Sequence, residues 1–309
     1  MVPEVFSEAV SLVWPRVYGT TRFELDRFEL GLTGRESGLE AVRPAGPGML
    51  VGVVVDDGDL EVRVSEAMAQ DWGVSFDDVL AAALGNAARC EFQVETITPE
   101  VFLVREPNFD PHLWLEPGVL KIFPAESPLL VATPMRGFTL VGVDRADTLT
   151  IFAGVMGDML QSGQELESVT VCRQGGSGWE AVAWEQAPIA PGLVDMVTKL
   201  FADQGYARQK PLLEAWQNDG EGLFVAGHKV LRSPDGRVVS RAAWSQGVVT
   251  LLPVVDEVLL VGEDLSQTEV SWQRFAEIVS EAAQPCGLIP ERFRVTQFPS
   301  QNAMNAIAT

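Results

Sequence analysis

The sequence is poor in the residues that most often perform catalysis or bind transition metals. Among its 309 residues there are two histidines, His112 and His228, and three cysteines, Cys90, Cys172 and Cys286. Neither histidine has a second histidine or a cysteine near it at metal-ligand spacing, which argues against a zinc site. The Gly-x-Ser-x-Gly motif of hydrolases and the His-Glu-x-x-His motif of zinc proteases are also missing. We therefore expect neither a metal nor a cofactor, and the sequence alone identifies no catalytic residue.

One nucleophilic arrangement stays open at this point, because a cysteine and a histidine meet in the fold rather than in the sequence. Cys172 with either histidine is an example of such a pair. The three cysteines are far apart and odd in number, which is typical of small buried side chains in a reducing compartment. We therefore expect a cytoplasmic protein.

The sequence also lacks long hydrophobic runs. No stretch of about 18 apolar residues occurs, so we expect no segment that spans a bilayer. The first residues have no basic group ahead of their apolar stretch and carry Glu4 and Glu8 within it. We interpret them as an amphipathic helix that begins at Pro3, and not as a secretion signal.

Basic residues are few relative to acidic ones. The chain has 22 Lys and Arg against 43 Asp and Glu, which gives a formal net charge of −21. Such a field repels nucleic-acid phosphates and anionic lipid headgroups, so we expect neither nucleic acid nor membrane as a partner. A protein with a basic surface is the expected partner, although solubility alone also explains the charge. The oligomeric state does not follow from the sequence.

The densest acidic cluster lies in a predicted β-hairpin. The apolar run 49–55 is followed by Asp56, Asp57, Gly58 and Asp59 and then by a second run over 60–64. This order predicts two strands joined by a tight turn. Three aspartates are suitable ligands for calcium or magnesium, but the EF-hand ligand pattern is incomplete, so a solvated turn is the simpler interpretation.

A second predicted hairpin joins residues 169–173 to 179–184 through a glycine-rich loop at 175–178. Phosphate-binding loops need a strand before and a helix after, whereas strands are predicted on both sides of this loop, so we interpret it as a flexible hairpin. Most of the tryptophans are expected in the core. Trp179 and Trp184 flank the loop, and together with Asp56, Asp57 and Asp59 they form the candidate interaction surface.

The order of the predicted elements indicates an α+β fold. Strands occur in runs joined by short hairpins, with helices at the ends of each run, which predicts mostly antiparallel sheets with helices packed on one face. The polar residues Ser65 and Ser75 are good helix N-caps. Strands are expected at 101–105, 119–123, 129–133, 138–143, 223–226, 238–243, 248–252, 258–261 and 293–297, and helices at 66–72, 76–88, 149–160, 192–204 and 270–282.

Two related modules are expected. The segment 186–192 contains Pro188 and Pro191 and divides the chain into domains 1–188 and 189–309. In each half an apolar strand ends in a proline (Pro134 and Pro253) and is followed by a turn, a second strand and a helix. We therefore expect the second domain to be a divergent repeat of about residues 65–163, with chance recurrence of a common pattern as the alternative.

The segment from Val64 to Ser75, with Trp72-Gly73-Val74-Ser75 at its end, and the following helix to Asn86 resemble a bacterial family catalogued as domain of unknown function 1444. The apolar strand that ends in Pro134 also matches, and the resemblance covers roughly residues 50–185. The chain departs from the family in its apparent second copy and in the turn 134–137, where an Arg-Asp pair is more typical. The resemblance implies a cytoplasmic location, no established activity and no catalytic residues.

These observations favour a non-catalytic protein–protein interaction module of the adaptor, chaperone or immunity type, with an acidic surface. The alternative is an enzyme that uses carboxylates, with or without a divalent cation, in a cleft between the two modules. A purely structural subunit that forms a homo-oligomer is a third hypothesis.

Overall fold

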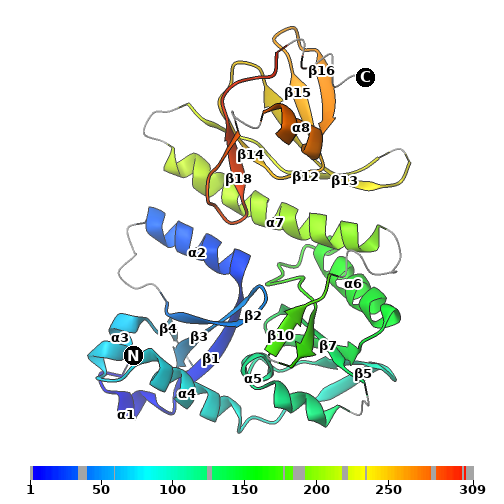
Figure 1. The fold of residues 1–309 in the computed structure, drawn as a ribbon. Coiled ribbons are helices and arrows are strands. Elements are labelled where there is room, and N and C mark those ends of the chain that lie inside the picture. The colour runs from blue at the N-terminus through cyan, green and yellow to red at the C-terminus, as the bar shows by residue number, and fades with distance from the viewer. Residues whose placement is uncertain are drawn as a thin grey trace. The chain divides into compact units, whose positions relative to one another are not determined.

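A computed structural model describes residues 3–33, 40–58, 60–123, 127–176, 178–183, 192–217, 222–233, 235–279, 283–300 and 303. Their helices and sheets form the expected α+β fold (Figure 1). The chain divides into two compact units, Met1–Val194 and Asp195–Thr309. The boundary expected between residues 188 and 189 lies outside the described residues.

Unit 1 begins with an antiparallel sheet. Its order is β1 (Val13–Gly19), β3 (Met49–Asp56) and β2 (Val42–Gly46), and β4 (Glu61–Arg63) also pairs with β3. The predicted hairpin over 49–64 is thus confirmed. The helices of this part are α1 (Phe6–Ala9), α2 (Thr20–Leu32), α3 (Glu66–Asp71) and α4 (Phe76–Ala87).

Helix α4 packs on this sheet because its apolar side chains recur every three or four residues. Phe76, Val79 and Ala83 are buried together with Val51 and Val53 of β3. Local hydrogen bonds fix where the helices begin. The Ser65 hydroxyl accepts from the Met68 amide at the start of α3, and Ser75 forms a capping box with Asp78 at the start of α4.

The N-terminal segment differs from the prediction in two ways. The first helix begins at Phe6 and not at Pro3. It ends at Ala9, because Val13 and Val17 are buried in the core as residues of strand β1. Helix α2 lies in a region for which the sequence pattern predicted no helix. Its two buried residues, Phe23 and Leu25, are two positions apart and so do not share one face of the helix, which leaves only a weak helical pattern in the sequence.

The second sheet of unit 1 is antiparallel throughout, with the order β10-β9-β7-β8-β6-β5. Helix α6 (Ala146–Gln161) contacts β7 and β8. A short helix, α5 (Phe109–Leu115), and a 3-10 helix (Pro117–Ile122) connect β6 to β7. The strands are β5 (Val94–Thr98), β6 (Val101–Val104), β7 (Leu129–Met135), β8 (Phe138–Val143), β9 (Cys172–Gly175) and β10 (Gly178–Ala181).

The strand predicted over 119–123 is wrong, because this segment belongs to the 3-10 helix and the residue after it. Pro117 stands at the start of that helix, where its missing amide hydrogen costs nothing. Leu120 and Phe123 are both buried. Their spacing of three residues matches one turn of a 3-10 helix and not the alternation of a half-buried strand.

The described residues of unit 2 form one long helix, α7 (Leu193–Trp216), a short helix, α8 (Trp272–Ile278), and two four-stranded sheets. Two of the strand pairs, β11 with β14 and β13 with β15, are parallel, and the other pairs are antiparallel. The strand order of the first sheet is β11 (Phe224–Val225), β14 (Thr250–Pro253), β18 (Arg292–Val295) and β17 (Ala283–Pro285). The strand order of the second sheet is β12 (Lys229–Arg232), β13 (Val238–Ser245), β15 (Glu257–Val261) and β16 (Gln267–Ser271).

Helix α7 does not stop at Gly205 as predicted. Tyr206, Gln209 and Leu213 continue its buried stripe, and this tertiary burial outweighs the low helix propensity of Gly205 and Pro211. Although α7 is long, no helix among the described residues is both long and apolar enough to cross a membrane.

The strands on which the predicted repeat depends are paired differently in the two units. Strand β7, which contains Pro134, forms one hairpin with β8. Strand β14, which ends at Pro253, and the following strand β15 belong to two different sheets. Strand pairing therefore gives the duplication no support, and the duplication stays a prediction.

Candidate functional site

Asp56 and Asp57, the two described aspartates of the acidic hairpin, stabilise the turn that contains them. Asp56 accepts a hydrogen bond from the Gly58 amide (2.9 Å), and Asp57 accepts one from the Leu60 amide (2.9 Å). Asp56 also lies 3.6 Å from the buried Arg16. Asp59 lies outside the described residues. Among the residues that the structure describes, no group of three acidic, histidine or cysteine side chains is placed to hold a metal ion.

Trp179 packs against a second tryptophan, Trp114 of helix α5. The ring centroids are 5.0 Å apart and the planes make an angle of 59°. The Trp179 indole donates a hydrogen bond to the Trp114 carbonyl (2.9 Å), which fixes the orientation of the partly exposed ring. Trp184, the other tryptophan of the candidate interaction surface, lies outside the described residues.

The two tryptophans line a groove of about 670 Å³ that is open to solvent. We refer to it as the tryptophan groove. One wall comes from the β9–β10 hairpin and the other from β2 and the end of α5. Strands β2 and β10 contact each other. The lining consists of Pro44, Ala45, Gly46, Trp114, Leu115, Pro117, Gly118, Gln174, Gly175, Gly176, Gly178 and Trp179.

Glycine is required at one point of this lining. A Cβ atom at Gly46 would lie 2.6 Å from the Trp114 ring, so any side chain there displaces the indole. Gly178 has φ +139°, a backbone conformation that side chains disfavour, and it closes the β9–β10 turn. The glycine-rich loop therefore acts as a hairpin, as predicted, and exposes main chain along the groove.

A buried chain of hydrogen bonds holds Trp114 in place. Its indole donates to the Thr133 hydroxyl (3.1 Å), which lies 3.0 Å from the Thr139 hydroxyl, and Thr139 donates to Asp110. Since Thr139 gives its proton to Asp110, Thr133 must donate to Thr139. Every hydrogen bond of this chain is then donated in the direction from the Trp114 indole to the Asp110 carboxyl group. Asp110 also accepts a hydrogen bond from the Gly137 amide.

Asp110 is fully buried. Burial raises the pKa of its carboxyl group to about 7, against the hydrogen bonds from Thr139 and Gly137, which lower it. Trp114 of the groove is thus connected, through two threonines, to a group that titrates near neutral pH. Because Asp110 belongs to α5 and accepts from Gly137, it also ties α5 to the turn between β7 and β8.

The charges beside the groove are mainly acidic. Glu116 and Glu180, each next to a lining residue in the sequence, are exposed. Arg43 is already paired with Glu66 (3.0 Å) and Asp77 (2.8 Å). Arg173 likewise donates to Asp144 (3.0 Å). Because the neighbouring arginines are paired, the field at the rim of the groove favours cations.

A partly buried ionic network lies elsewhere in unit 1. Arg16 is 2.8 Å from Glu61, and Arg136 is 3.5 Å from the same carboxylate. Burial opposes the ionisation of Glu61, but these arginines lower its pKa below the usual range. Glu40 lies 3.5 Å from Arg63, and burial raises its pKa to about 7. These groups join strands and turns, and none of them lines the tryptophan groove.

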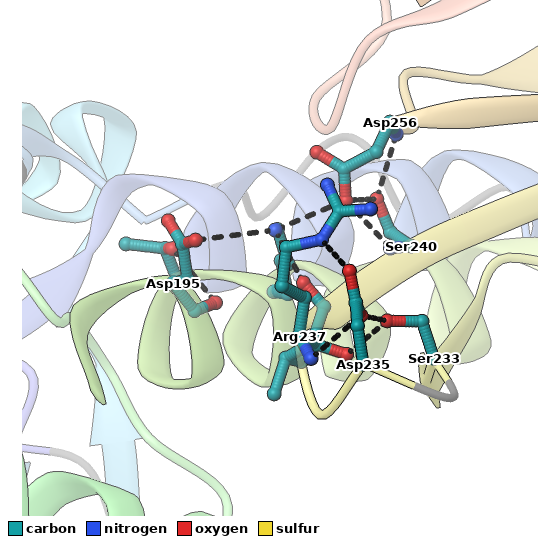
Figure 2. Close-up of polar contacts among 9 residues, drawn as sticks. Asp195, Ser233, Asp235, Arg237, Ser240 and Asp256 are labelled. Atoms are coloured by element: carbon teal, nitrogen blue, oxygen red, sulfur yellow. Dashed lines mark hydrogen bonds and ion pairs between the residues drawn. The ribbon is translucent and has the colours of Figure 1, made fainter. Parts of the chain in front are cut away.

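Unit 2 has a polar cluster that brings a serine, a lysine and an aspartate together. Figure 2 labels its serine and aspartate, Ser240 and Asp256. Lys199 lies 3.1 Å from Asp256 and donates to the Val238 carbonyl (2.7 Å). Asp256 accepts from the amide and hydroxyl of Ser240, and the Ser240 hydroxyl in turn accepts from the Asp256 amide. These hydrogen bonds connect α7 to the strands, and the Ser240 side chain is buried.

The side chains of Cys172 and His228 also have structural roles. Burial raises the pKa of the Cys172 thiol to about 12, which makes it a poor nucleophile. His228 lies 2.9 Å from Asp203 and stacks on Tyr206. The structure therefore does not support Cys172 as the nucleophile of a cysteine–histidine pair.

No protein-family model, curated protein or solved structure matches the chain. The resemblance to domain of unknown function 1444 therefore stays a prediction, and the site is judged by its geometry. Trp179 was predicted from the sequence as part of the interaction surface, whereas Trp114 and Gly46 were not. The only local signal for Trp114 is its position just before the Pro117-Gly118 pair, which predicts a chain reversal.

Proposed function

We propose that this protein is a non-catalytic interaction module, and that its tryptophan groove binds an extended, proline-containing basic segment of a partner protein. The observation that carries the proposal is the groove itself. In a chain of net charge −21, it is lined by two packed tryptophans, two prolines and exposed glycine main chain, and none of its lining residues is charged.

Each part of the lining suits such a segment. Aromatic-lined grooves bind proline-rich segments because a polyproline helix is already extended and loses little entropy on binding. Gly175, Gly176 and Gly178 allow a bound main chain to approach that of the groove. Glu116 and Glu180 at the rim favour basic residues in the bound segment.

The free thiols of all three cysteines support a reducing, cytoplasmic setting for this interaction. The carboxylate-dependent enzyme is the weaker proposal, because Glu40 and Asp110, whose pKa values are raised to about 7, are buried away from the groove lining. A thermal-shift titration with Mg²⁺ and Ca²⁺ tests it. Stabilisation by either ion at millimolar concentration would favour the enzyme.

The test of the interaction module is a selection of peptides from a random library displayed on phage, with the full-length protein as bait. We expect selected peptides to contain proline and Lys or Arg. A synthetic peptide from the selection should bind Trp179→Ala roughly 30-fold more weakly than wild type, because a central tryptophan contributes about 2 kcal/mol or more to an interface.

Trp216→Ala is the matched control, since Trp216 is 61% exposed and lies in unit 2. Its affinity for the peptide should equal that of wild type. Binding should also weaken as salt rises from about 50 to about 300 mM, because the attraction between acidic rim and basic peptide is screened. Peptides that bind Trp179→Ala as tightly as wild type would refute the assignment to this groove.

A further inference from the structure

Asp110 stands at the end of the hydrogen-bond chain that holds Trp114, and it is fully buried. Its carboxyl group accepts from the Thr139 hydroxyl of β8 and from the Gly137 amide in the turn before β8. Asp110 itself belongs to α5, about one helical turn before Trp114. The chain therefore connects the protonation state of one carboxyl group to the position of a residue that lines the tryptophan groove.

Few charges act on this carboxyl group. Arg136, in the turn between β7 and β8, favours its ionisation, but the Arg136 guanidinium forms an ion pair with Glu61 (3.5 Å). Glu106, in the segment before α5, opposes its ionisation. The other titratable side chain of α5 is His112, which lies 3.7 Å from Glu116. Burial is thus the largest effect on the carboxyl group, and it raises the pKa to about 7.

When Asp110 is ionised, its oxygens can only accept hydrogen bonds, so the chain has a single arrangement. The Trp114 indole donates to Thr133, Thr133 donates to Thr139, and Thr139 donates to the carboxylate. Every donor of the chain has an acceptor, and a hydrogen bond to a charged carboxylate is stronger than one to a neutral group. Burying the charge lowers the stability of the unit, but the charge holds the chain, and Trp114 with it, in one position.

When Asp110 holds a proton, its carboxyl group has a hydrogen to donate. The oxygen beside Thr139 carries this hydrogen, since the other oxygen accepts from the Gly137 amide. Thr139 then accepts from Asp110 and donates to Thr133, which already accepts from Trp114. The hydroxyl hydrogen of the buried Thr133 is left without an acceptor in the chain, at a cost in free energy. The neutral state therefore holds Trp114 less firmly.

Trp114 transmits this difference to the groove. Its ring is tightly enclosed, because a Cβ atom at Gly46 would lie only 2.6 Å from it. The Trp179 indole donates to the Trp114 carbonyl, and the two ring centroids are 5.0 Å apart. Leu115 and Pro117, which follow Trp114 closely in the chain, also line the groove. A change in how firmly Trp114 is held therefore changes the order of the whole wall.

We propose that Asp110 is a proton-controlled switch of the tryptophan groove: the ionised carboxyl group orders the groove for binding, and protonation loosens it. The proposal rests on the function proposed above, because it concerns the same groove. Asp110 is a positioning residue, since it acts through Trp114 and does not itself line the groove. An ordered groove loses less entropy on binding, so affinity for the bound segment should rise as the pH rises from 6 to 8.

The first test needs no ligand and uses the full-length protein labelled with ¹⁵N. The resonance of the Trp114 indole N–H, assigned with Trp114→Phe, should move between pH 6 and pH 8, because its acceptor Thr133 changes its own hydrogen bonds. The Trp244 indole, which donates to the Val248 carbonyl in unit 2, is the internal reference and should not move. In Asp110→Asn the Trp114 resonance should stay at one position. A Trp114 resonance that is constant in wild type, or that moves equally in Asp110→Asn, would overturn the proposal.

Two further variants separate the chain from other titrating groups. Thr139→Val interrupts the chain but keeps Asp110, and valine has nearly the shape of threonine, so the Trp114 resonance should lose its pH dependence. His112→Gln is the matched control, because it removes the other titratable side chain of α5. It should leave the pH dependence of Trp114 as in wild type. Loss of the pH dependence in His112→Gln would show that the histidine, and not Asp110, controls Trp114.

The second test measures binding of an N-acetylated peptide from the selection on the tryptophan groove. The peptide contains no histidine, so its own charge is the same at pH 6 and pH 8. Isothermal titration calorimetry should show that wild type binds it about fivefold more tightly at pH 8, which corresponds to one hydrogen bond. Asp110→Asn should bind it equally at both values, because the asparagine amide donates to Thr139 as the protonated carboxyl group does. The same pH dependence in both proteins would overturn the switch.

The two tests keep the switch apart from the proposed function. If the selection gives no peptide that binds the groove, the proposed function fails. A Trp114 resonance that follows the ionisation of Asp110 would still support the switch in that case. If a peptide binds through Trp179 with the same affinity at pH 6 and pH 8, the proposed function stands and the switch is refuted.

Discussion

At the scale of single residues, Asp110 has an environment that makes the stability of unit 1 depend on pH. Burial raises its pKa to about 7, whereas an exposed aspartate titrates near pH 4. Between these values the folded state holds a proton that the unfolded state has lost. Stability therefore falls as pH rises from about 4 to 7, by an amount of up to about 4 kcal/mol.

The prediction is that Asp110→Asn removes this part of the pH dependence. Urea denaturation at pH 5, 6, 7 and 8 measures it, and the stability of the variant relative to wild type should increase with pH. Glu40→Gln should act in the same direction, because burial raises the pKa of Glu40 to about 7 as well. Parallel profiles for wild type and Asp110→Asn would show that Asp110 does not titrate in this range.

Gly46 is the second residue with a testable role. Gly46→Ala places a methyl group 2.6 Å from the Trp114 ring and should destabilise the protein by roughly 2 kcal/mol while displacing the indole from the groove. Gly85→Ala is the matched control, because Gly85 lies in α4 with open space around it. It should stabilise the protein by about 0.5 to 1 kcal/mol. Equal effects of the two substitutions, measured by urea denaturation, would contradict the packing argument.

At the scale of elements, the Lys199–Asp256–Ser240 cluster joins α7 to strand β13 and to the residue before β15 (Figure 2). Burial opposes the ionisation of Asp256, but hydrogen bonds from Ser240 and Lys199 lower its pKa below the usual range. A lowered pKa contributes stability that is present above about pH 4 and is lost as pH falls toward the folded-state value.

Asp256→Asn should therefore destabilise unit 2 at pH 7, by roughly 1 kcal/mol after allowance for its partial exposure. The difference from wild type should shrink below about pH 4. Thermal unfolding followed by circular dichroism at pH 3, 5 and 7 measures this, with Lys199→Met as the companion variant. An Asp256→Asn variant as stable as wild type at pH 7 would show that the cluster is only a surface contact.

At the scale of the whole molecule, each unit contains the apolar contacts that a folded domain needs. In unit 2, Trp244, Leu252, Val258 and Phe275 belong to one buried cluster, whose members all lie between residues 226 and 298. Tyr206 of α7 donates a hydrogen bond to the Glu291 carbonyl and accepts one from the Val254 amide, and both partners belong to the same unit. These observations fit a domain that contains its own core.

We therefore predict that a fragment of residues 192–309 folds by itself. It should show a single cooperative thermal transition and a circular dichroism spectrum with both helix and strand signals. Trp244→Ala, which removes a fully buried side chain, should abolish or sharply lower this transition. A fragment without a cooperative transition would mean that unit 2 depends on the rest of the chain.

The features that the sequence alone determined are those that depend on near neighbours. The hairpin at Asp56, the glycine turn before Trp179 and the caps at Ser65 and Ser75 all use hydrogen bonds between residues a few positions apart. Their chemistry is therefore readable in a short stretch of sequence. The α+β class followed because the order of such local elements restricts how they can pack.

Only the tertiary structure decided which distant residues meet. Helix α7 continues past Gly205, and residues 119–122 form a 3-10 helix, because burial of side chains outweighs local propensity. Trp114 joins Trp179 across 65 positions of the chain. This pair depends on the order of strands in a sheet and on where α5 packs, which no local pattern specifies.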